Sequence, residues 1–320
     1  MIELPEGYLA RRPTLADAAP AQRLLDDIET AECGEPRRHD NRLVVDFRDP
    51  RIDLGRDAWL VLAPQGATAP IAGLAVVWSP HATGEIPSDA YVHPEHRGRG
   101  LSGALLDALL SRAAERAATL PPEVQGTLVV WAQPDGEYRA ALDERGFAVV
   151  RHFFEMRIDL GGALATPVWP SGILVATLRP GRDERLLHAA DADAFAEHYM
   201  FQERPYEEWR RNHIDVPEFD PALWLVAWDG DEIAGYAAAT ISGQGGMVDD
   251  LAVRRPWRRR GLGSALLLAE FRELATRGAR AVRLFVDAQN ESGAVALYER
   301  AGMVAARRFA AHGRDVARVG

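Results

Sequence analysis

The sequence predicts a mixed α/β protein made of two similar halves in tandem. Three observations lead to this prediction. The chain has 320 residues, about twice the ~150 residues of an average domain. Its two halves carry the same short motifs in the same order. In each half a β-prone run leads into a glycine-rich turn, which is followed by an Ala/Leu-rich segment with helical spacing.

The repeat is anchored by two arginine- and glycine-rich segments. Residues 97–102 read Arg-Gly-Arg-Gly-Leu-Ser and residues 258–263 read Arg-Arg-Arg-Gly-Leu-Gly, an offset of 258 − 97 = 161. Three further pairs match in order: Trp59-Leu60-Val61 with Trp224-Leu225-Val226, Ile71-Ala72-Gly73 with Ile233-Ala234-Gly235, and Glu144-Arg145-Gly146-Phe147 with Arg300-Ala301-Gly302-Met303. Four matches in one order indicate a tandem duplication.

The same elements are expected in both halves. The predicted strands are residues 59–63, 71–78, 89–93 and 127–132, then 223–228, 233–240, 248–253 and 281–286. The third strand enters the glycine turn, and a helix follows with Leu101, Leu105 and Leu109, or Leu262, Leu266 and Ala269, on one side. A short helix and a terminal strand complete each half. A Gly-Gly pair and two prolines in residues 161–172 indicate a linker between domains 1–160 and 173–320.

Composition excludes several functional classes. The 37 basic and 47 acidic residues give a net charge of −10; nucleic-acid binding is not expected, since phosphate contacts need a basic face. A cationic small molecule is compatible with this charge. Cys33 is the one cysteine, so no internal disulfide is possible. The chain shows no secretory signal or apolar run of ~20 residues, so a cytoplasmic protein without a membrane span is expected. The histidines lack metal-ligand spacing, and no metal site is predicted.

The glycine turns are suited to holding a phosphate group. The first backbone N–H groups of a helix have no partner within the helix, and the helix dipole makes that end positive. Glycine removes the Cβ that would keep an anion from these amides. A tight turn with a solvated basic rim is the alternative interpretation. The pattern lacks the spacing of a dinucleotide motif and the lysine of a Walker motif.

The segment Val253-Arg254-Arg255-Pro256-Trp257-Arg258-Arg259-Arg260-Gly261-Leu262-Gly263 resembles the acetyl-CoA motif of the GCN5-related N-acetyltransferases (GNAT). Residues 290–303, Asn-Glu-Ser-Gly-Ala-Val-Ala-Leu-Tyr-Glu-Arg-Ala-Gly-Met, resemble the second motif of that family. The two-domain layout is similar to mycothiol synthase and to actinobacterial tandem acetyltransferases. This resemblance implies two tandem GNAT-like acyl-CoA N-acyltransferase domains, with acetyl-CoA as the cofactor.

The resemblance also implies roles for residues of the second half. The backbone of Leu251, Ala252 and Val253 would pair with pantetheine, and Asn290 would bond to the pantetheine arm. The cradle for the pyrophosphate would be formed by Arg258, Arg259, Arg260, Gly261, Leu262, Gly263 and Ser264. Tyr298 would protonate the leaving thiolate, a role that requires a weak acid beside a developing anion. Packing of Tyr298 on the sheet is the structural alternative.

A base is expected to accept the proton of the amine. In the family a Glu or His often stands four or six residues before the valine that Val253 matches. Six before is Met247, a departure from the family pattern, and four before is Asp249. Strand alternation would place Met247 and Asp249 on one face and Asp250 on the other. Asp249 is the predicted base, with Asp250 or a water chain as the alternative; Asp249 could also only attract a cationic acceptor.

The first half departs from the catalytic pattern. Leu142 stands at the position of Tyr298, Ser88 at that of the base, and Ser102 at that of the last glycine. Arg97, Gly98, Arg99 and Gly100 remain, so these four residues, together with Tyr91, Val92 and Ser102, are a second, weaker set of candidate cofactor-binding residues. The half is predicted to be catalytically degenerate, serving as a scaffold or holding CoA without turnover.

The sequence therefore predicts an enzyme that transfers an acetyl group from acetyl-CoA to a primary amine of a small molecule, with the second half catalytic. The alternatives are a CoA-binding regulatory or scaffold protein, and an N-acyltransferase that uses a longer acyl-CoA. Either a monomer or a homodimer is compatible with the tandem repeat. Acidic residues 26–32 could meet a cationic substrate or form a solvated helix face. His198, Tyr199, Tyr206 and Trp209 could line an aromatic pocket or belong to a core.

Overall fold

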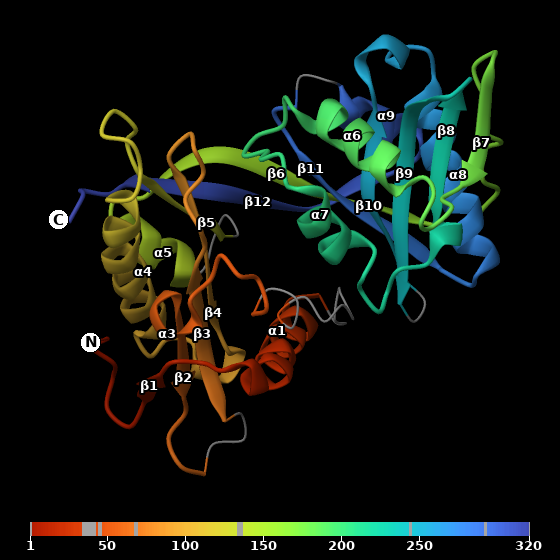
Figure 1. Ribbon diagram of the computed structural model, residues 1–320. Coiled ribbons are helices and arrows are strands. Elements are labelled where there is room, and N and C mark those ends of the chain that lie inside the picture. Colours follow the sequence, from red (N-terminus) through yellow and green to blue (C-terminus); the bar gives the residue numbers. More distant parts are fainter. Residues whose placement is uncertain are drawn as a thin grey trace. The chain divides into compact units, whose positions relative to one another are not determined.

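The computed structural model describes residues 2–33, 43, 47–66, 70–132, 137–242, 245–290 and 293–319. They form two compact units. Unit 1 contains Met1–His152 and Phe309–Gly320, and unit 2 contains Phe153–Arg308. Each unit has a mixed sheet with helices on both faces (Figure 1). This confirms the predicted mixed α/β class for both halves.

In unit 1 the strand order is β1-β2-β3-β4-β5-β12. These strands are β1 (Leu9–Arg11), β2 (Ala58–Leu62), β3 (Ile71–Val77), β4 (Glu85–Val92), β5 (Thr127–Ala132) and the last part of β12 (Val304–Asp315). Only β4 and β5 pair in parallel among the described pairs of this unit. The helices are α1 (Ala18–Cys33), the short α3 (Leu54–Asp57), α4 (Leu101–Ala117) and α5 (Glu137–Glu144).

Two apolar clusters hold unit 1 together, one on each face of the sheet. Alternate residues of β2 point to opposite sides: Trp59 and Val61 pack with the leucines of α4, while Ala58 and Leu60 pack with α1. The i, i+4 spacing of Leu101, Leu105 and Leu109 puts these fully buried side chains on the sheet-facing side of α4. The sheet of unit 1 is therefore covered by α4 and α5 on one face and by α1 on the other (Figure 1).

Unit 2 has the strand order β6-β11-β10-β9-β8-β7. These strands are β7 (Ile173–Thr177), β8 (Trp224–Asp229), β9 (Glu232–Ser242), β10 (Gly245–Val253), β11 (Ala281–Asp287) and the second part of β6 (Ala148–Asp159). The helices are α6 (Glu184–Phe195), α7 (Tyr206–His213), α8 (Leu262–Thr276) and α9 (Ala294–Arg300). Helices α6 and α7 share one core cluster with the sheet, and α8 and α9 share the cluster on its other face.

The terminal strands of the two sequence halves are exchanged. Strand β6 follows α5 of the first half, yet it pairs antiparallel with β11 in unit 2, where Met156 lies opposite Leu284. Strand β12 follows α9 of the second half and pairs antiparallel with β5 in unit 1, where His312 lies opposite Val130. Each compact unit thus takes its last strand from the other half of the sequence.

The match between Trp59 and Trp224 is wrong by one residue. Trp59 lies opposite Ala75 and packs on the α4 side of its sheet, whereas Trp224 lies opposite Ala238 and packs on the α6–α7 side. When Gly73 is matched with Gly235, the counterpart of Trp59 is Leu225. Trp59 lies opposite Ala75, two residues after Gly73, and Leu225 lies opposite Ala237, two residues after Gly235. A shift of one residue moves a side chain to the other face of a sheet.

The predicted strands and helices are otherwise found within a few residues of their expected bounds, including the strand that enters each glycine turn. Throughout the described residues, helices fall short of the length and apolar character needed to cross a membrane. In the same part of the chain, no group of three or more His, Cys, Asp or Glu side chains is arranged to hold a metal ion.

Candidate functional site

The parallel strands β10 and β11 separate before either of them ends. Their pairing runs from Gly245 opposite Ala281 to Met247 opposite Arg283 and then stops, although β10 continues to Val253. On its other edge β10 stays paired with β9 as far as Val253 opposite Gly235. The second part of β10 therefore has one edge without a strand partner in the described ladder. The predicted pantetheine-binding residues Leu251, Ala252 and Val253 all lie in this part.

A β-bulge lies at the start of the same segment. Val248 is opposite Ala239 and Asp250 is opposite Ala238, which leaves Asp249 as the extra residue of β10. Simple alternation across residues 247–250, expected from sequence, is therefore wrong: Met247 is buried and Asp249 is exposed. The carboxylate of Asp249 accepts a hydrogen bond of 2.9 Å from Thr240 Oγ1. Asp250 is half-buried, and its charge acts on Tyr236 and Tyr298.

The turn before α8 leaves the first amides of the helix uncapped. Gly261 is the N-cap of α8, has φ of +85°, and no side chain caps this end. A Cβ at Gly261 would project into open space, so a larger side chain would occupy the volume in front of those amides. Arg259 also adopts a positive φ, +60°, which is costly for a residue with a side chain. The turn thus has the geometry of an anion site at a helix N-terminus.

The three arginines of this turn have different surroundings. Arg258 is fixed: its Nε donates to the Val253 carbonyl at 2.9 Å, its Nη2 to the Ala194 carbonyl at 3.0 Å, and its Nη1 pairs with Glu197. Arg259 and Arg260 have no carboxylate partner among the described residues. Leu262 is buried, and a Cβ at Gly263 would contact Leu297 at 3.1 Å, so both of these predicted residues also serve packing.

Tyr298 lies in α9 and is 8% exposed. Burial, followed by the negative charge of Asp250, raises the pKa of its phenol to about 12. The ring belongs to the α8–α9 core cluster, so packing and a chemical role coexist at this residue. Asn290 lies in the turn after β11, where its backbone N–H donates to the Asp287 backbone carbonyl at 3.1 Å. Glu291 and Ser292 of the second motif lie outside the described residues.

The aromatic residues of α7 belong to a core. Trp209 is 2% exposed and packs on His213 and Trp224, at ring-centroid distances of 5.1 and 6.2 Å. Tyr206 donates to Glu184 at 2.6 Å and lies on His188. Tyr199 lies 6.4 Å from Phe153. Of the two alternatives left by the sequence, core packing is therefore the one found for Trp209.

Histidines and a further carboxylate lie around the same sheet end. The Tyr236 hydroxyl donates to Asp191. Burial lowers the pKa of His198, which packs on Phe195 at 4.5 Å. Burial also lowers the pKa of His213, and the charges of Asp191 and Asp249 act on it in the opposite direction. The carboxylates Asp191, Asp249 and Asp250 thus act on two buried tyrosines, Tyr236 and Tyr298, and on histidines of unit 2.

Unit 1 repeats this framework with different side chains. The pairing of β4 with β5 stops at Ser88 opposite Val130, so the predicted residues Tyr91 and Val92 lie beyond it. Gly98 and Gly100 have φ of +73° and +81° at the start of α4, with Arg97 and Arg99 beside them. Leu142 is fully buried in the core, and Ser88 and Ser102 are also buried. Leu142, at the position of Tyr298, carries no ionisable proton, and Ser88, at the position of the predicted base, carries no carboxylate.

Contacts of α1 account for part of the acidic stretch at residues 26–32. Glu32 pairs with Arg97 at 2.8 Å, Asp27 lies 3.4 Å from His93, and Asp26 accepts from Gln22 at 3.2 Å. These contacts hold α1 against the glycine turn of unit 1. They give the stretch a structural role beyond solvation.

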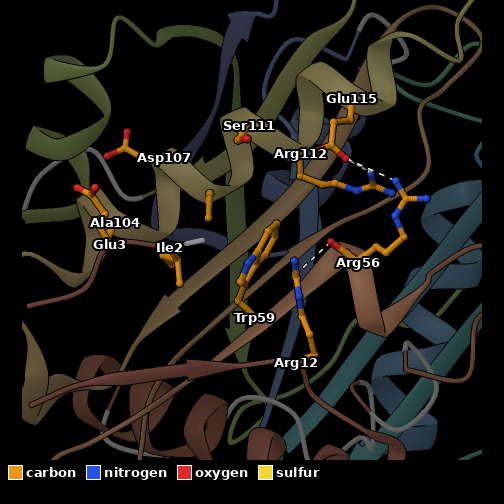
Figure 2. Close-up of a pocket in the computed structure, with 11 residues that line it drawn as sticks. Ile2, Glu3, Arg12, Arg56, Trp59, Ala104, Asp107, Ser111, Arg112 and Glu115 are labelled. Atoms are coloured by element: carbon orange, nitrogen blue, oxygen red, sulfur yellow. Dashed lines mark hydrogen bonds and ion pairs between the residues drawn. The ribbon is translucent and has the colours of Figure 1, made fainter. Parts of the chain in front are cut away.

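A cavity of about 540 Å³ in unit 1 has no counterpart in the sequence prediction (Figure 2). It lies along the flank of α4, with Trp59 and Arg12 on one side and Asp107 and Ser111 on the other. The Arg12 guanidinium stacks on the Trp59 ring at 4.4 Å. None of the predicted cofactor or catalytic residues lines it. The cavity combines residues from the N-terminus, β2 and α4, so no local motif could have indicated it.

Comparisons with known proteins agree with both halves of this description. The model of the family described as "Acetyltransferase (GNAT) family" matches residues 24–125 and 185–303. A mycothiol acetyltransferase of Catenulispora acidiphila is 31% identical over 307 residues, 92% of this chain and 94% of the relative. One from Frankia alni is 32% identical and covers 96% of this chain and 93% of its own.

Solved structures show the same architecture over the full length. The crystal structure of a GCN5-related N-acetyltransferase from Sphaerobacter thermophilus has a TM-score of 0.77 and 32% identity, and covers 99% of this chain and 98% of its own. A tandem GNAT protein from the clavulanic acid biosynthesis pathway has a TM-score of 0.68 at 18% identity, over 98% and 100% of the two chains. The tandem arrangement thus occurs in solved proteins.

Proposed function

The chain belongs to the GNAT family of acetyltransferases, and from this we propose that unit 2 transfers the acetyl group of acetyl-CoA to a primary amine of a small molecule. Family membership makes the protein an acyltransferase that uses acetyl-CoA. The observation that carries the assignment to unit 2 is the placement of Tyr298. Tyr298 of the second motif has a buried phenol that keeps its proton, and the charge of Asp250 acts on it, whereas unit 1 has Leu142 at the position of Tyr298.

The residues of unit 2 fit acetyl-CoA. The uncapped amides of residues 261–264 and the cations Arg259 and Arg260 would hold the pyrophosphate. The unpaired edge of Leu251, Ala252 and Val253 would bond to the pantetheine arm as an added strand does, and Asn290 would add a side-chain contact. Acetyl-CoA supplies the acetyl group as a thioester, from which an amine forms an amide as the carbon–sulfur bond breaks.

Tyr298 would supply the proton for the departing sulfur. A phenol whose pKa is raised to about 12 keeps its proton at neutral pH. It can therefore donate in the transfer step and cannot act there as the base. Its burial excludes most water from the acid, which strengthens its interaction with a developing negative charge.

Asp249 would accept the proton of the amine, directly or through water. It is the exposed carboxylate of the bulge, so an acceptor arriving from solvent can reach it. The Thr240 hydroxyl fixes the orientation of this carboxylate. Asp250 is half-buried and acts on Tyr298, which suits it to setting the proton affinity of the acid. The bulge thus gives adjacent carboxylates two different tasks.

A cationic small molecule is the acceptor class that these charges favour. The charge of Asp250 acts on Tyr298, the charges of Asp191 and Asp249 act on His213 of the same unit, and the chain carries a net charge of −10. The similar proteins named mycothiol acetyltransferase support a small-molecule acceptor. Holding the amine against the thioester would supply much of the rate enhancement.

Matched substitutions in the two glycine turns test which unit catalyses. Gly261 and Gly100 have nearly the same φ, +85° and +81°, so Gly261→Val and Gly100→Val impose the same backbone strain. We expect Gly261→Val to abolish acetylation of an amine, measured as released CoA thiol, and Gly100→Val to leave the rate nearly unchanged. Equal loss in both variants, or loss only in Gly100→Val, would contradict the assignment to unit 2.

A further inference from the structure

The first turn of α5 in unit 1 carries two large side chains where unit 2 has two small ones. Gly146 matches Gly302, an offset of 302 − 146 = 156 residues. With this offset Glu137 corresponds to Gly293, and Tyr138 to Ala294. Both pairs stand at the beginning of the short helix that carries Tyr298 in unit 2 and Leu142 in unit 1.

Glu137 engages the glycine turn of unit 1. Its Oε2 accepts a hydrogen bond from the backbone N–H of Gly98, the residue equivalent to Arg259. A carboxylate thus takes one of the amides that the pyrophosphate of a bound cofactor would approach. In unit 2 the corresponding side chain is absent, because Gly293 has none.

The glycine turn of unit 1 also carries less positive charge than the glycine turn of unit 2. Arg97 pairs with Glu32 in unit 1 and Arg258 pairs with Glu197 in unit 2, so this contact is common to both. Beyond it, the turn of unit 2 has Arg259 and Arg260, whereas that of unit 1 has Arg99 and the opposing Glu137. The turn of unit 1 is therefore more negative by about two charges, which disfavours a pyrophosphate.

Tyr138, the next residue of α5, is partly buried and packs against the apolar cluster of unit 1. Its phenol oxygen is buried and has no hydrogen-bond partner among the described residues. Burial, followed by the charge of Asp89, raises the pKa of this phenol. Asp89 corresponds to Asp250 at the repeat offset of 161. The phenol of Tyr138 is thus within the electrostatic reach of the residue of β4 that corresponds to Asp250.

We propose that Glu137 and Tyr138 together occupy the cofactor position of unit 1 and thereby restrict acetyl-CoA to unit 2. Glu137 stands where the pyrophosphate would bind, and Tyr138 occupies volume near the thioester end. A buried hydroxyl without a hydrogen-bond partner among the described residues is unfavourable, so packing alone does not explain this residue. This inference rests on the proposed function, since it takes unit 2 as the working site.

Calorimetric titration of the full chain with acetyl-CoA tests the proposal. The wild type is expected to bind one molecule per chain, and Glu137→Gln/Tyr138→Ala two. Glu144→Gln is the matched control: it removes a charge from the same helix, at an exposed side chain whose ion pair within the described part of the chain is with Arg145 at 3.8 Å. This control is expected to keep one site.

A second pair of variants isolates unit 1. In a Gly261→Val background we expect no binding, and addition of Glu137→Gln/Tyr138→Ala should restore one site. Glu137→Gln alone is the variant to use if circular dichroism shows the double substitution unfolded. Added to Gly261→Val, this single substitution should give measurable binding of acetyl-CoA at one site, where Gly261→Val alone shows none.

The titration separates this inference from the proposed function. A gain of one site on substitution supports the inference, and no gain in a folded variant overturns it. Two sites in the wild type overturn it as well. The proposed function depends on a different number: a wild type that binds no acetyl-CoA contradicts it, whatever the substituted chains do.

Discussion

Tyr298 and Asp250 are electrostatically coupled across the end of β10. Burial makes the larger contribution and the Asp250 carboxylate the next, and together they raise the pKa of the Tyr298 phenol to about 12. The coupling joins a helix residue, Tyr298, to a residue of the bulged strand. Burial and the Asp250 charge both disfavour the phenolate, so the Tyr298 hydroxyl keeps its proton at neutral pH.

Replacement of Tyr298 by Phe should lower kcat and leave acetyl-CoA binding nearly unchanged. The ring and its packing in the α8–α9 core are kept, and only the acidic proton is lost. General acid catalysis typically contributes about 10²–10⁴-fold, so a loss within this range is expected. Rates measured by thiol release and affinities measured by calorimetry check the two parts. Tyr138→Phe is the control, because it removes a buried phenol oxygen from unit 1 and should not alter turnover.

The two carboxylates of the bulge should give different pH profiles when neutralised. Asp249→Asn removes the proposed base and should lower kcat/KM by about 10²–10⁴-fold. Asp250→Asn removes a charge that raises the pKa of Tyr298, so that pKa should fall. Because activity needs the protonated phenol, the alkaline loss of activity should begin at lower pH in Asp250→Asn. Unchanged alkaline limbs in both variants would contradict the division of roles.

The sequence was sufficient for the local elements and insufficient for their long-range pairing. The glycine turns and the helices that follow them are specified by motifs a few residues long, and they lie where they were predicted. The exchange of β6 and β12 depends on which sheet a strand joins, which apolar alternation does not encode. The bulge at Asp249 and the register of Trp59 depend on a single inserted residue, and periodicity cannot detect it. Glu137 was missed because its partner, Gly98, is 39 residues away in sequence.

Because of Glu270, the stability of unit 2 should fall as the pH rises from 4.5 to about 9. The side chain of Glu270 is fully buried in α8, and burial, followed by the charge of Glu273, raises its pKa from 4.5 to about 9. Below pH 4.5 the carboxyl is protonated in both folded and unfolded chains. Between pH 4.5 and 9 only the unfolded chain ionises, so stability is lost as the pH rises.

Glu270→Gln should therefore stabilise the protein at neutral and alkaline pH. The amide has nearly the volume of the neutral acid and cannot ionise, so the gain should grow as the pH approaches 9. Urea unfolding of wild type and variant across this range measures the gain. A gain independent of pH would show that Glu270 does not hold its proton in the folded chain.

His312 should have the opposite effect, on the acid side. It is fully buried; its Nδ1 lies 3.1 Å from the Ala310 carbonyl, and its Nε2 lies 2.6 Å from Arg139 Nη1. Arg139 can only donate, so these contacts fit a neutral ring protonated on Nδ1. Burial, followed by the charge of Arg139, lowers the pKa of His312 below 6.5.

Stability should therefore fall as the pH drops below 6.5, because His312 is protonated in the unfolded chain at a pH at which it stays neutral in the folded chain. In His312→Gln this fall should be smaller, since the amide can keep a donor and an acceptor without titrating. Thermal unfolding at a series of pH values tests this difference. Parallel curves for the two proteins would contradict it.

The proposed reaction of unit 2 joins the acetyl group of acetyl-CoA to a small primary amine. Its most direct test is incubation of the full chain with acetyl-CoA and a panel of small primary amines, the acceptor of the mycothiol acetyltransferases among them. Released CoA thiol and acetylated amine are quantified together, the latter by mass spectrometry. We predict equal amounts of the two with at least one amine, and loss of both in Tyr298→Phe. Thiol release without acetylated amine, or neither product with any amine of the panel, would contradict the claim.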